Sequence, residues 1–158
     1  MSITVRPASL TDVPAICRLQ SQELGYHCTL EMTRRRLEDI LQKPENRVWI
    51  AETDGRAAGF VHAADYDCIY CESLKNILAI AVDYTVQRQG VGRALVCAVE
   101  DWARECGSAG VRLVSGTDRQ GAHRFYEACG YFLRKEQKNF MRLFDAPAPD
   151  AAKGEGHG

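Results

Sequence analysis

The segment VDYTVQRQGVGRAL at residues 82–95 joins an apolar stretch to an amphipathic one. Residues 74–82 form a long apolar run rich in β-branched residues, which predicts a strand covered on both faces. Gly90 and Gly92 lie at the turn, where the missing Cβ lets backbone N–H groups approach an anion. A helix that begins here adds unpaired donors and a partial positive charge, so the segment predicts a cradle for a diphosphate. The apolar face of that helix comprises Val91, Leu95, Val99 and Trp102.

Two common phosphate-binding patterns do not fit this turn. The P-loop needs Gly-Lys-Ser/Thr, whereas Gly92 is followed by Arg93-Ala94. The dinucleotide fingerprint needs a small residue at the position of Leu95. A nucleotide-binding module is therefore the weakest of the functions considered.

Two motifs resemble those of the GNAT superfamily of N-acetyltransferases. Residues 87–92, QRQGVG, fit its acetyl-CoA-binding pattern Gln/Arg-x-x-Gly-x-Gly/Ala. Residues 122–131, AHRFYEACGY, fit its second signature, Ala-x-x-Phe-Tyr-x-x-x-Gly-aromatic. The opening Val5-Arg6-Pro7-Ala8 followed by Asp12 is also common in the family. Order and spacing match over roughly residues 3–144, nearly the whole chain.

The fold class expected from the sequence is a mixed α/β (α+β) domain. The resemblance implies a central mixed, mostly antiparallel sheet, splayed around the cofactor and flanked by about four helices. Asp54-Gly55 is a strong hairpin signal between two of the strands. Periodicity predicts helices near Val13–Cys17 and at 30–41, 91–106 and 122–129. It predicts strands at 3–6, 48–53, 59–64, 74–82, 111–115, 131–134 and 139–144.

Length and composition limit the architecture and the class of protein. A chain of 158 residues is the size of one domain, which we place at 1–144, with a flexible, Pro- and Gly-rich tail at 145–158. The net charge of −1 argues against nucleic acid and anionic membrane surfaces as partners. The N-terminus has no signal-peptide pattern and no stretch is apolar enough to span a membrane, so we expect a cytoplasmic protein.

Seven cysteines, odd in number and scattered, fit buried thiols in a reducing compartment. Cys68-x-x-Cys71 invites a zinc or redox interpretation. No second ligand pair accompanies it, and zinc favours four well-spaced ligands, so we expect a structural role and no metal.

The resemblance assigns roles around acetyl-CoA as co-substrate. The Val82 N–H would stabilise the oxyanion at a strand end where the family has a β-bulge, and Tyr126 would protonate the departing thiolate. Apart from the motif, Tyr126 also fits a core aromatic after Phe125. Backbone at Ile80, Ala81 and Val82 would pair with pantetheine amides. The expected pyrophosphate-binding residues are Gln87, Arg88, Gln89, Gly90, Val91, Gly92 and Arg93.

Two positions depart from the family pattern. Asn76 stands where a catalytic Glu is often found, and an amide cannot act as a base at neutral pH. Glu72, on the same face by strand alternation, is one substitute, and water held near Asn76 is another; Glu72 also fits a plain surface carboxylate. Arg119 replaces the usual Asn before the second signature and is expected to approach a CoA phosphate.

The expected reaction is acetyl transfer to a primary amine of a small molecule or peptide. A non-catalytic acyl-CoA-binding sensor is the alternative, which Asn76 keeps open. The sequence does not identify the acceptor, although carboxylates would suit a cationic amine. A homodimer is common among relatives. The candidate acceptor residues are Tyr26, His27, Asp65, Asp67, Tyr70 and Glu72.

Overall fold

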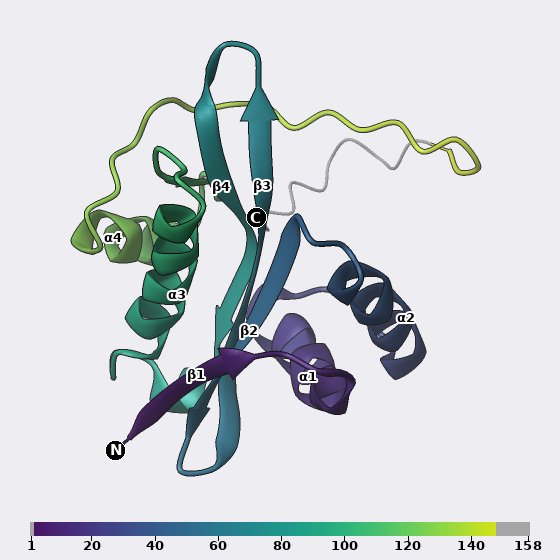
Figure 1. Ribbon diagram of the computed structural model, residues 1–158. Coiled ribbons are helices and arrows are strands. Elements are labelled where there is room, and N and C mark those ends of the chain that lie inside the picture. The colour runs from purple at the N-terminus through teal and green to yellow at the C-terminus, as the bar shows by residue number, and fades with distance from the viewer. Residues whose placement is uncertain (1, 148–158) are drawn as a thin grey trace. The chain divides into compact units, whose positions relative to one another are not determined.

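The computed structural model of the chain describes residues 2–147 (Figure 1). It divides after Val114 into two compact units, Met1–Val114 and Ser115–Gly158, and each is described here by itself. Among the described residues, no helix is long and apolar enough to cross a membrane. The predicted tail at 145–158 lies outside the described residues from position 148 onward.

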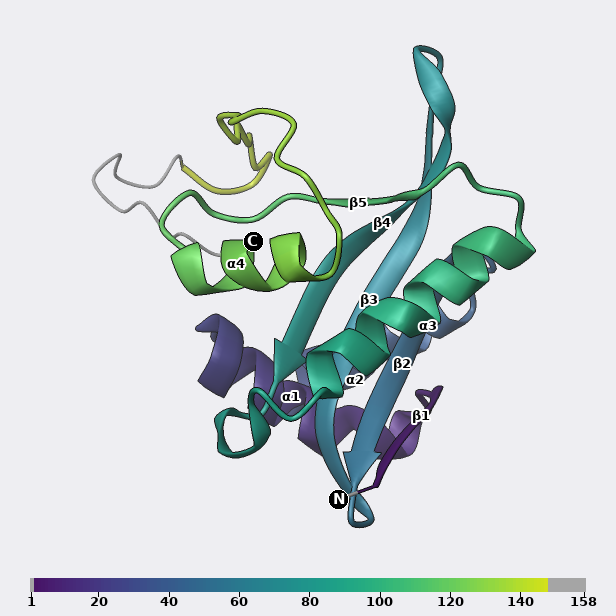
Figure 2. The same ribbon diagram turned by 90° about the vertical axis from the view of Figure 1, so that its left-hand side faces the viewer.

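The first unit is a five-stranded sheet in the order β1-β2-β3-β4-β5. The first three pairs are antiparallel and β4 pairs with β5 in parallel, which confirms the mixed, mostly antiparallel sheet. Helices α1 and α2 cover one face and α3 covers the other (Figures 1 and 2). Its strands are β1 (Ile3–Pro7), β2 (Asn46–Thr53), β3 (Arg56–Cys68), β4 (Cys71–Val82) and β5 (Val111–Leu113). Its helices are η1 (Leu10–Asp12), α1 (Val13–Leu24), α2 (Leu30–Leu41), η2 (Tyr84–Val86) and α3 (Val91–Glu105).

Helix α3 buries the apolar face that the sequence predicts. Its face packs on the sheet around Val61, Ala63 and Ile77, and the Trp49 and Trp102 rings meet edge to face with centroids 5.7 Å apart. The opposite face of the sheet packs against α1 and α2. The α3 side chains in this core are Val91, Leu95, Val99 and Trp102.

The turn between β2 and β3 confirms the hairpin expected at Asp54-Gly55. Asp54 has φ 53° and Gly55 has φ 78°, so both residues of this two-residue loop have positive φ. That conformation matches the right-handed twist of the flanking strands, which is why Asp-Gly is favoured there.

The expected bulge lies in β4, but not at Val82. His62 pairs with Ala79 and Ala63 with Ile77, so Leu78 is the extra residue. Val82 pairs with Gly59 in regular register. The prediction of a bulge at Val82 was therefore wrong by four residues, because a bulge depends on the partner strand and β4 alone does not reveal it. Leu78 is 50% exposed, so β4 is also not covered on both faces throughout.

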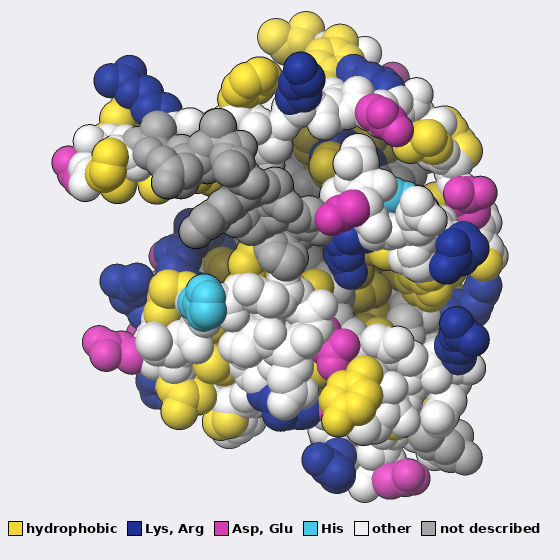
Figure 3. All heavy atoms as spheres, turned by 180° about the vertical axis from the view of Figure 1, so that it is seen from behind, with side chains coloured by type: hydrophobic (Ala, Val, Ile, Leu, Met, Phe, Trp, Pro, Cys, Tyr) yellow, Lys and Arg dark blue, Asp and Glu magenta, His cyan; other side chains and the backbone are white. Residues whose placement is uncertain are grey.

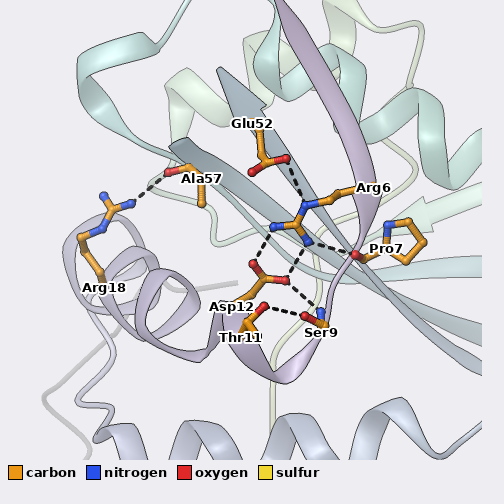
Figure 4. A network of polar contacts seen from close by, with 8 residues as sticks. All are labelled: Arg6, Pro7, Ser9, Thr11, Asp12, Arg18, Glu52 and Ala57. Atoms are coloured by element: carbon orange, nitrogen blue, oxygen red, sulfur yellow. Dashed lines mark hydrogen bonds and ion pairs between the residues drawn. The ribbon is translucent and has the colours of Figure 1, made fainter. Parts of the chain in front are cut away.

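An ion pair between the half-buried Arg6 and the buried Asp12 joins β1 to the start of α1 (Figure 4). The Arg6 guanidinium donates to both Asp12 carboxylate oxygens, at 2.7 and 2.9 Å, and its Nε donates to Glu52 on β2 at 3.1 Å. Asp12 also accepts from the Ser9 backbone N–H at 2.8 Å. The hydrogen bond from Arg6 lowers the pKa of Asp12, although burial opposes it.

The second unit contains one helix among its described residues, α4 (Gln120–Ala128). It ends at Ala128, and Gly130 follows the C-cap residue Cys129 with a φ of 95°, which suits a glycine after a helix. The predicted strands at 131–134 and 139–144 are wrong, since no residue from 131 to 144 is in a strand. Their apolar side chains are exposed, with Phe132 at 81% and Phe140 at 88%, and strands need a partner to persist.

Candidate functional site

Strand β4 has an open edge over its last residues. The Asp83 N–H donates to the Ala58 carbonyl of β3 at 2.8 Å, so by alternation the Val82 and Ile80 amides point away from β3. Among the described residues, β5 pairs only with positions 75–77 of β4. The Ile80 and Val82 amides therefore lie on an edge that no described strand covers. Ala81 faces β3 by the same alternation and offers nothing to this edge.

The bulge at Leu78 creates this arrangement. The Lys75 N–H donates toward β5, to the Gly110 carbonyl at 3.0 Å, whereas from Ala79 onward the odd-numbered residues turn toward β3. One extra residue reverses the alternation, so the amides of Ile80 and Val82, and not those of Ala79 and Ala81, face the open edge.

The loop after β4 is anchored to helix α1. Asp83 accepts from the Thr85 backbone N–H at 3.0 Å and hydroxyl at 2.7 Å, and from Arg18 of α1 at 2.6 Å. The hydrogen bonds from Thr85 lower the pKa of Asp83, and the Arg18 contact adds to them. Arg18 also donates to the Ala57 carbonyl at 3.0 Å, as Figure 4 shows. The carboxylate thus shapes the loop instead of facing an anion.

Glu23, also on α1, is a second anchor. It accepts from the Tyr84 backbone N–H at 3.0 Å and lies 3.5 Å from the Gln87 side-chain amide. Gln87 in turn donates to the Val82 carbonyl at 3.4 Å. The motif glutamine therefore ties the loop to the end of β4 in this structure.

Backbone conformation at the start of α3 explains the motif glycine at position 90. Gly90 caps the helix with φ 93°, and Arg88 has φ 65° in the left-handed region. A residue with a Cβ is disfavoured at such angles, so Gly90 meets a backbone requirement. The first-turn N–H groups of a helix have no intrahelical acceptor, and Val91 and Gly92 contribute such groups here. This geometry fits an anionic diphosphate.

Asn76 is held by Arg112 of β5. The Arg112 guanidinium donates to the Asn76 Oδ1 at 2.7 Å and lies over the Tyr66 ring, 4.2 Å from its centroid. The Arg112 contact thus engages one of the two acceptor positions of the Asn76 carboxamide oxygen.

Glu72 is exposed near the tip of the β3–β4 hairpin. Tyr66 pairs with Leu74 but Cys68 pairs with Cys71, so β4 carries a further extra residue between them. This shift interrupts the alternation that put Glu72 on the face of Asn76. At roughly 3.3 Å per residue, Glu72 also lies on the order of 30 Å along β4 from Val82.

The expected acceptor residues are not brought together as a set. Asp65 forms an ion pair with Lys75, whose ammonium lies 4.1 Å from the centroid of the Trp102 ring on the α3 face. Tyr70 hydrogen-bonds Tyr66 through their hydroxyls at 3.2 Å. All six candidates are exposed: Tyr26, His27, Asp65, Asp67, Tyr70 and Glu72.

Tyr126 is the one buried hydrophobic residue of α4 among those described. Its ring packs against Phe125 and Tyr131, with centroids 5.3 and 6.4 Å away. Burial raises the pKa of Tyr126, and the positive charge of Arg119 partly opposes this. The phenol is therefore protonated at neutral pH. Arg119 itself is half-buried at the N-cap of α4.

The anchors Arg18, Glu23 and Asp83 were not identified from the sequence. Arg18 lies 65 residues from Asp83, and Glu23 lies 61 residues from Tyr84. Only the capping Asp83-x-Thr85 pattern offered a local signal.

The open β4 edge and the glycine-capped N-terminus of α3 together fit a ligand that carries a diphosphate. The chain belongs to the Acetyltransferase (GNAT) family, whose model matches residues 13–131. This finding confirms the resemblance seen in the two motifs.

Curated relatives agree with the family. The chain is 28% identical over 145 residues to an aminoglycoside N(6')-acetyltransferase type 1 of Stenotrophomonas maltophilia, covering 89% of this chain and 92% of that protein. It is 26% identical over 109 residues to an uncharacterized N-acetyltransferase of Methanocaldococcus jannaschii. The latter match covers 66% of this chain but 47% of the relative, so the chain spans about half of that protein.

Solved structures share the fold. The aminoglycoside acetyltransferase AAC(6')-Iy, in complex with the bisubstrate analog CoA-S-monomethyl-acetylneamine, superposes with a TM-score of 0.78 at 24% identity. The match covers 91% of this chain and 99% of that one. The likeness confirms the predicted fold class.

Proposed function

We propose that this chain is an acetyl-CoA-dependent N-acetyltransferase that acetylates a primary amine of a small molecule or peptide. The open β4 edge that leads into the glycine-capped N-terminus of α3 carries the proposal. Acetyl-CoA would supply an activated acetyl thioester. The amides of residues 87–93 would hold its pyrophosphate, with Arg88 and Arg93 as nearby cations. Arg119 is proposed to approach a CoA phosphate.

Backbone donors on β4 have two roles in this proposal. The Ile80 amide, on the open edge, would pair with a pantetheine amide. The Val82 N–H would donate to the acetyl carbonyl oxygen, where negative charge develops during transfer. Both donors are held in place by pairing of the opposite edge of β4 with β3, so they need little reorganisation.

Affinity for acetyl-CoA tests the cradle directly. Gly92→Leu places a side chain among the first-turn amides, and titration calorimetry should show that acetyl-CoA binding is lost. Cys97→Leu, on the exposed side of α3, is the control and should bind normally. Unchanged affinity of Gly92→Leu would place the cofactor elsewhere.

Tyr126 is the proposed general acid for the departing thiolate. Tyr126→Phe keeps the aromatic ring but removes the hydroxyl that would donate the proton. Turnover should therefore fall about tenfold or more, with acetyl-CoA affinity unchanged. Tyr131→Phe removes a hydroxyl from the neighbouring ring and serves as the control. Equal turnover of wild type and Tyr126→Phe would remove Tyr126 from the mechanism.

The general base is proposed to be solvent water, because Glu72 lies too far along β4 from Val82, the proposed donor to the acetyl carbonyl oxygen. Glu72→Gln should therefore keep its turnover and its pH profile. A Glu72→Gln variant whose turnover collapses would restore Glu72 as the base.

A non-catalytic acyl-CoA sensor is the second candidate, and the Asn76–Arg112 contact is the observation that favours it. A free-thiol release assay with acetyl-CoA and an amine panel separates the two functions. Release with at least one amine supports the enzyme, whereas tight binding without release supports the sensor. Aminoglycosides belong first in that panel because the Stenotrophomonas maltophilia relative is named for them.

We also propose a cytoplasmic location and leave a homodimer as an assembly to be tested. None of the seven cysteines forms a disulfide, which fits a reducing compartment. Size-exclusion chromatography with light scattering measures the assembly.

A further inference from the structure

The tip of the β3–β4 hairpin carries two cysteines that the acetyl-transfer proposal does not use. The hairpin projects past the ends of β1 and β2 (Figures 1 and 2). Its two-residue loop, Ile69-Tyr70, is 107% and 76% exposed, and hydrophobic side chains gather at this end of the molecule, at the top of Figure 3. Small oxidants in solution can therefore reach the tip.

Strand pairing brings the two thiols together. Cys68 and Cys71 are Cα partners across the hairpin, and their Sγ atoms lie 3.3 Å apart in a hydrogen bond. A disulfide bond is about 2.05 Å long, so the sulfur atoms must approach by roughly 1.2 Å, which side-chain rotation supplies. The backbone is already paired on both sides of the loop.

The surroundings of Cys68 favour its thiolate. Desolvation raises the pKa of Cys68, but hydrogen bonds from Cys71, Tyr70 and Tyr66 and the charge of Arg112 together lower it. The thiolate is the form that attacks disulfides.

The pair is not part of a wider cluster of ligating side chains in the described part of the chain. Among the described residues, no group of three or more His, Cys, Asp or Glu side chains converges to hold a metal ion. Structural zinc takes four ligands, and this tip supplies two. Two adjacent thiols without further ligands are suited to two-electron oxidation.

We propose that Cys68 and Cys71 are a redox-modification site that forms a reversible intramolecular disulfide with low-molecular-weight disulfides such as glutathione disulfide. The Cys68 thiolate attacks one sulfur of the reagent, forming a mixed disulfide and releasing one glutathione thiolate. Cys71 then attacks the Cys68 sulfur and releases the second. The two protons lost by the cysteines pass to the two glutathione thiolates, so two protein thiols are oxidised and one glutathione disulfide is reduced.

The test uses the full chain in buffers of varied ratio of oxidised to reduced glutathione, at constant total glutathione. After acid quenching and alkylation, peptide mapping should show a Cys68–Cys71 disulfide, with two hydrogens lost. The disulfide should form at a ratio of oxidised to reduced glutathione roughly tenfold or more below the ratio at which the exposed Cys97 becomes glutathionylated, because the second step is intramolecular.

Two variants sharpen the result. Cys71→Ser should trap glutathione on Cys68, because no thiol remains to resolve the mixed disulfide. Cys97→Ser should leave the Cys68–Cys71 titration unchanged. The proposal fails if wild-type Cys68 and Cys71 are alkylated in parallel with Cys97 at every ratio, or if wild-type Cys68 accumulates bound glutathione. The wild-type result decides this even if a variant folds poorly.

Discussion

Gly59 on β3 is a position where one added methyl group would disturb the residues that support the proposed cofactor cradle. A Cβ at Gly59 would lie 2.8 Å from the Ala81 carbonyl oxygen of β4. It would also lie 3.2 Å from Leu95 Cδ1 and 3.3 Å from Val91 Cγ1. The first of these contacts is with backbone, which cannot rotate away. Gly59→Ala therefore pushes against both the adjacent strand and the first turn of α3.

The size of the effect follows from overpacking. Forcing a methyl group into a closely packed core costs about 1–3 kcal/mol. For a chain of this size, each kcal/mol lowers the melting temperature by about 2–4 °C, so we expect Gly59→Ala to melt about 2–12 °C lower. Displacement of the first turn of α3 should also weaken acetyl-CoA binding.

Gly110→Ala is the matched control. Its added Cβ would meet Leu74 Cδ2 at 3.6 Å, an ordinary contact, and its φ is not in the left-handed region. Differential scanning calorimetry measures the melting temperatures, and isothermal titration measures acetyl-CoA affinity. If the melting temperatures of Gly59→Ala and Gly110→Ala both lie within about 1 °C of wild type, the steric argument for Gly59 is refuted.

Two further predictions concern buried polar groups. Burial, assisted by the Arg36 charge, lowers the pKa of His62 to about 4 in the folded protein, against about 6.5 in the unfolded chain. The unfolded chain therefore binds the proton first as the pH falls. Up to about 3 kcal/mol of the free energy of unfolding should be lost between pH 6.5 and pH 4. Urea unfolding at several pH values should show that His62→Gln loses less stability than wild type as the pH falls, whereas His27→Gln loses as much. The same pH dependence of stability in His62→Gln and wild type would contradict the reasoning. Asp12→Asn breaks the pair with Arg6 and should lower the free energy of unfolding by about 2 kcal/mol, whereas Asp39→Asn, at an exposed ion pair, should leave the urea midpoint close to that of wild type. Equal urea midpoints for the two variants would refute the difference.

Local features were predictable from local sequence. Asp54-Gly55 confirms its hairpin because both residues tolerate positive φ, a property of the residues themselves. Gly90 at the start of α3 is similar, because its φ of 93° and the helix that follows depend on adjacent residues. Local sequence alone therefore predicted the hairpin between β2 and β3 and the start of α3.

Features that depend on a partner strand were not predictable in the same way. Residues 131–144 alternate like strands, yet alternation does not provide a partner, and they form none in the described structure. The inference that Glu72 shares a face with Asn76 assumed unbroken alternation, and the extra residue that interrupts it becomes visible only when β3 is paired with β4.

The amino-acid sequence by itself determined the family, the order of most helices and strands, and the glycine-capped turn before α3, because these depend on neighbouring residues and on spacing along the chain. Only the tertiary structure decided which amides of β4 face the open edge, since the bulge at Leu78 reverses their direction. It alone brought Arg18 to Asp83, which lies 65 residues further along the chain. Hydrogen bonds act over about 3 Å, whereas the groups that make them can be far apart in sequence, so chain folding sets these contacts.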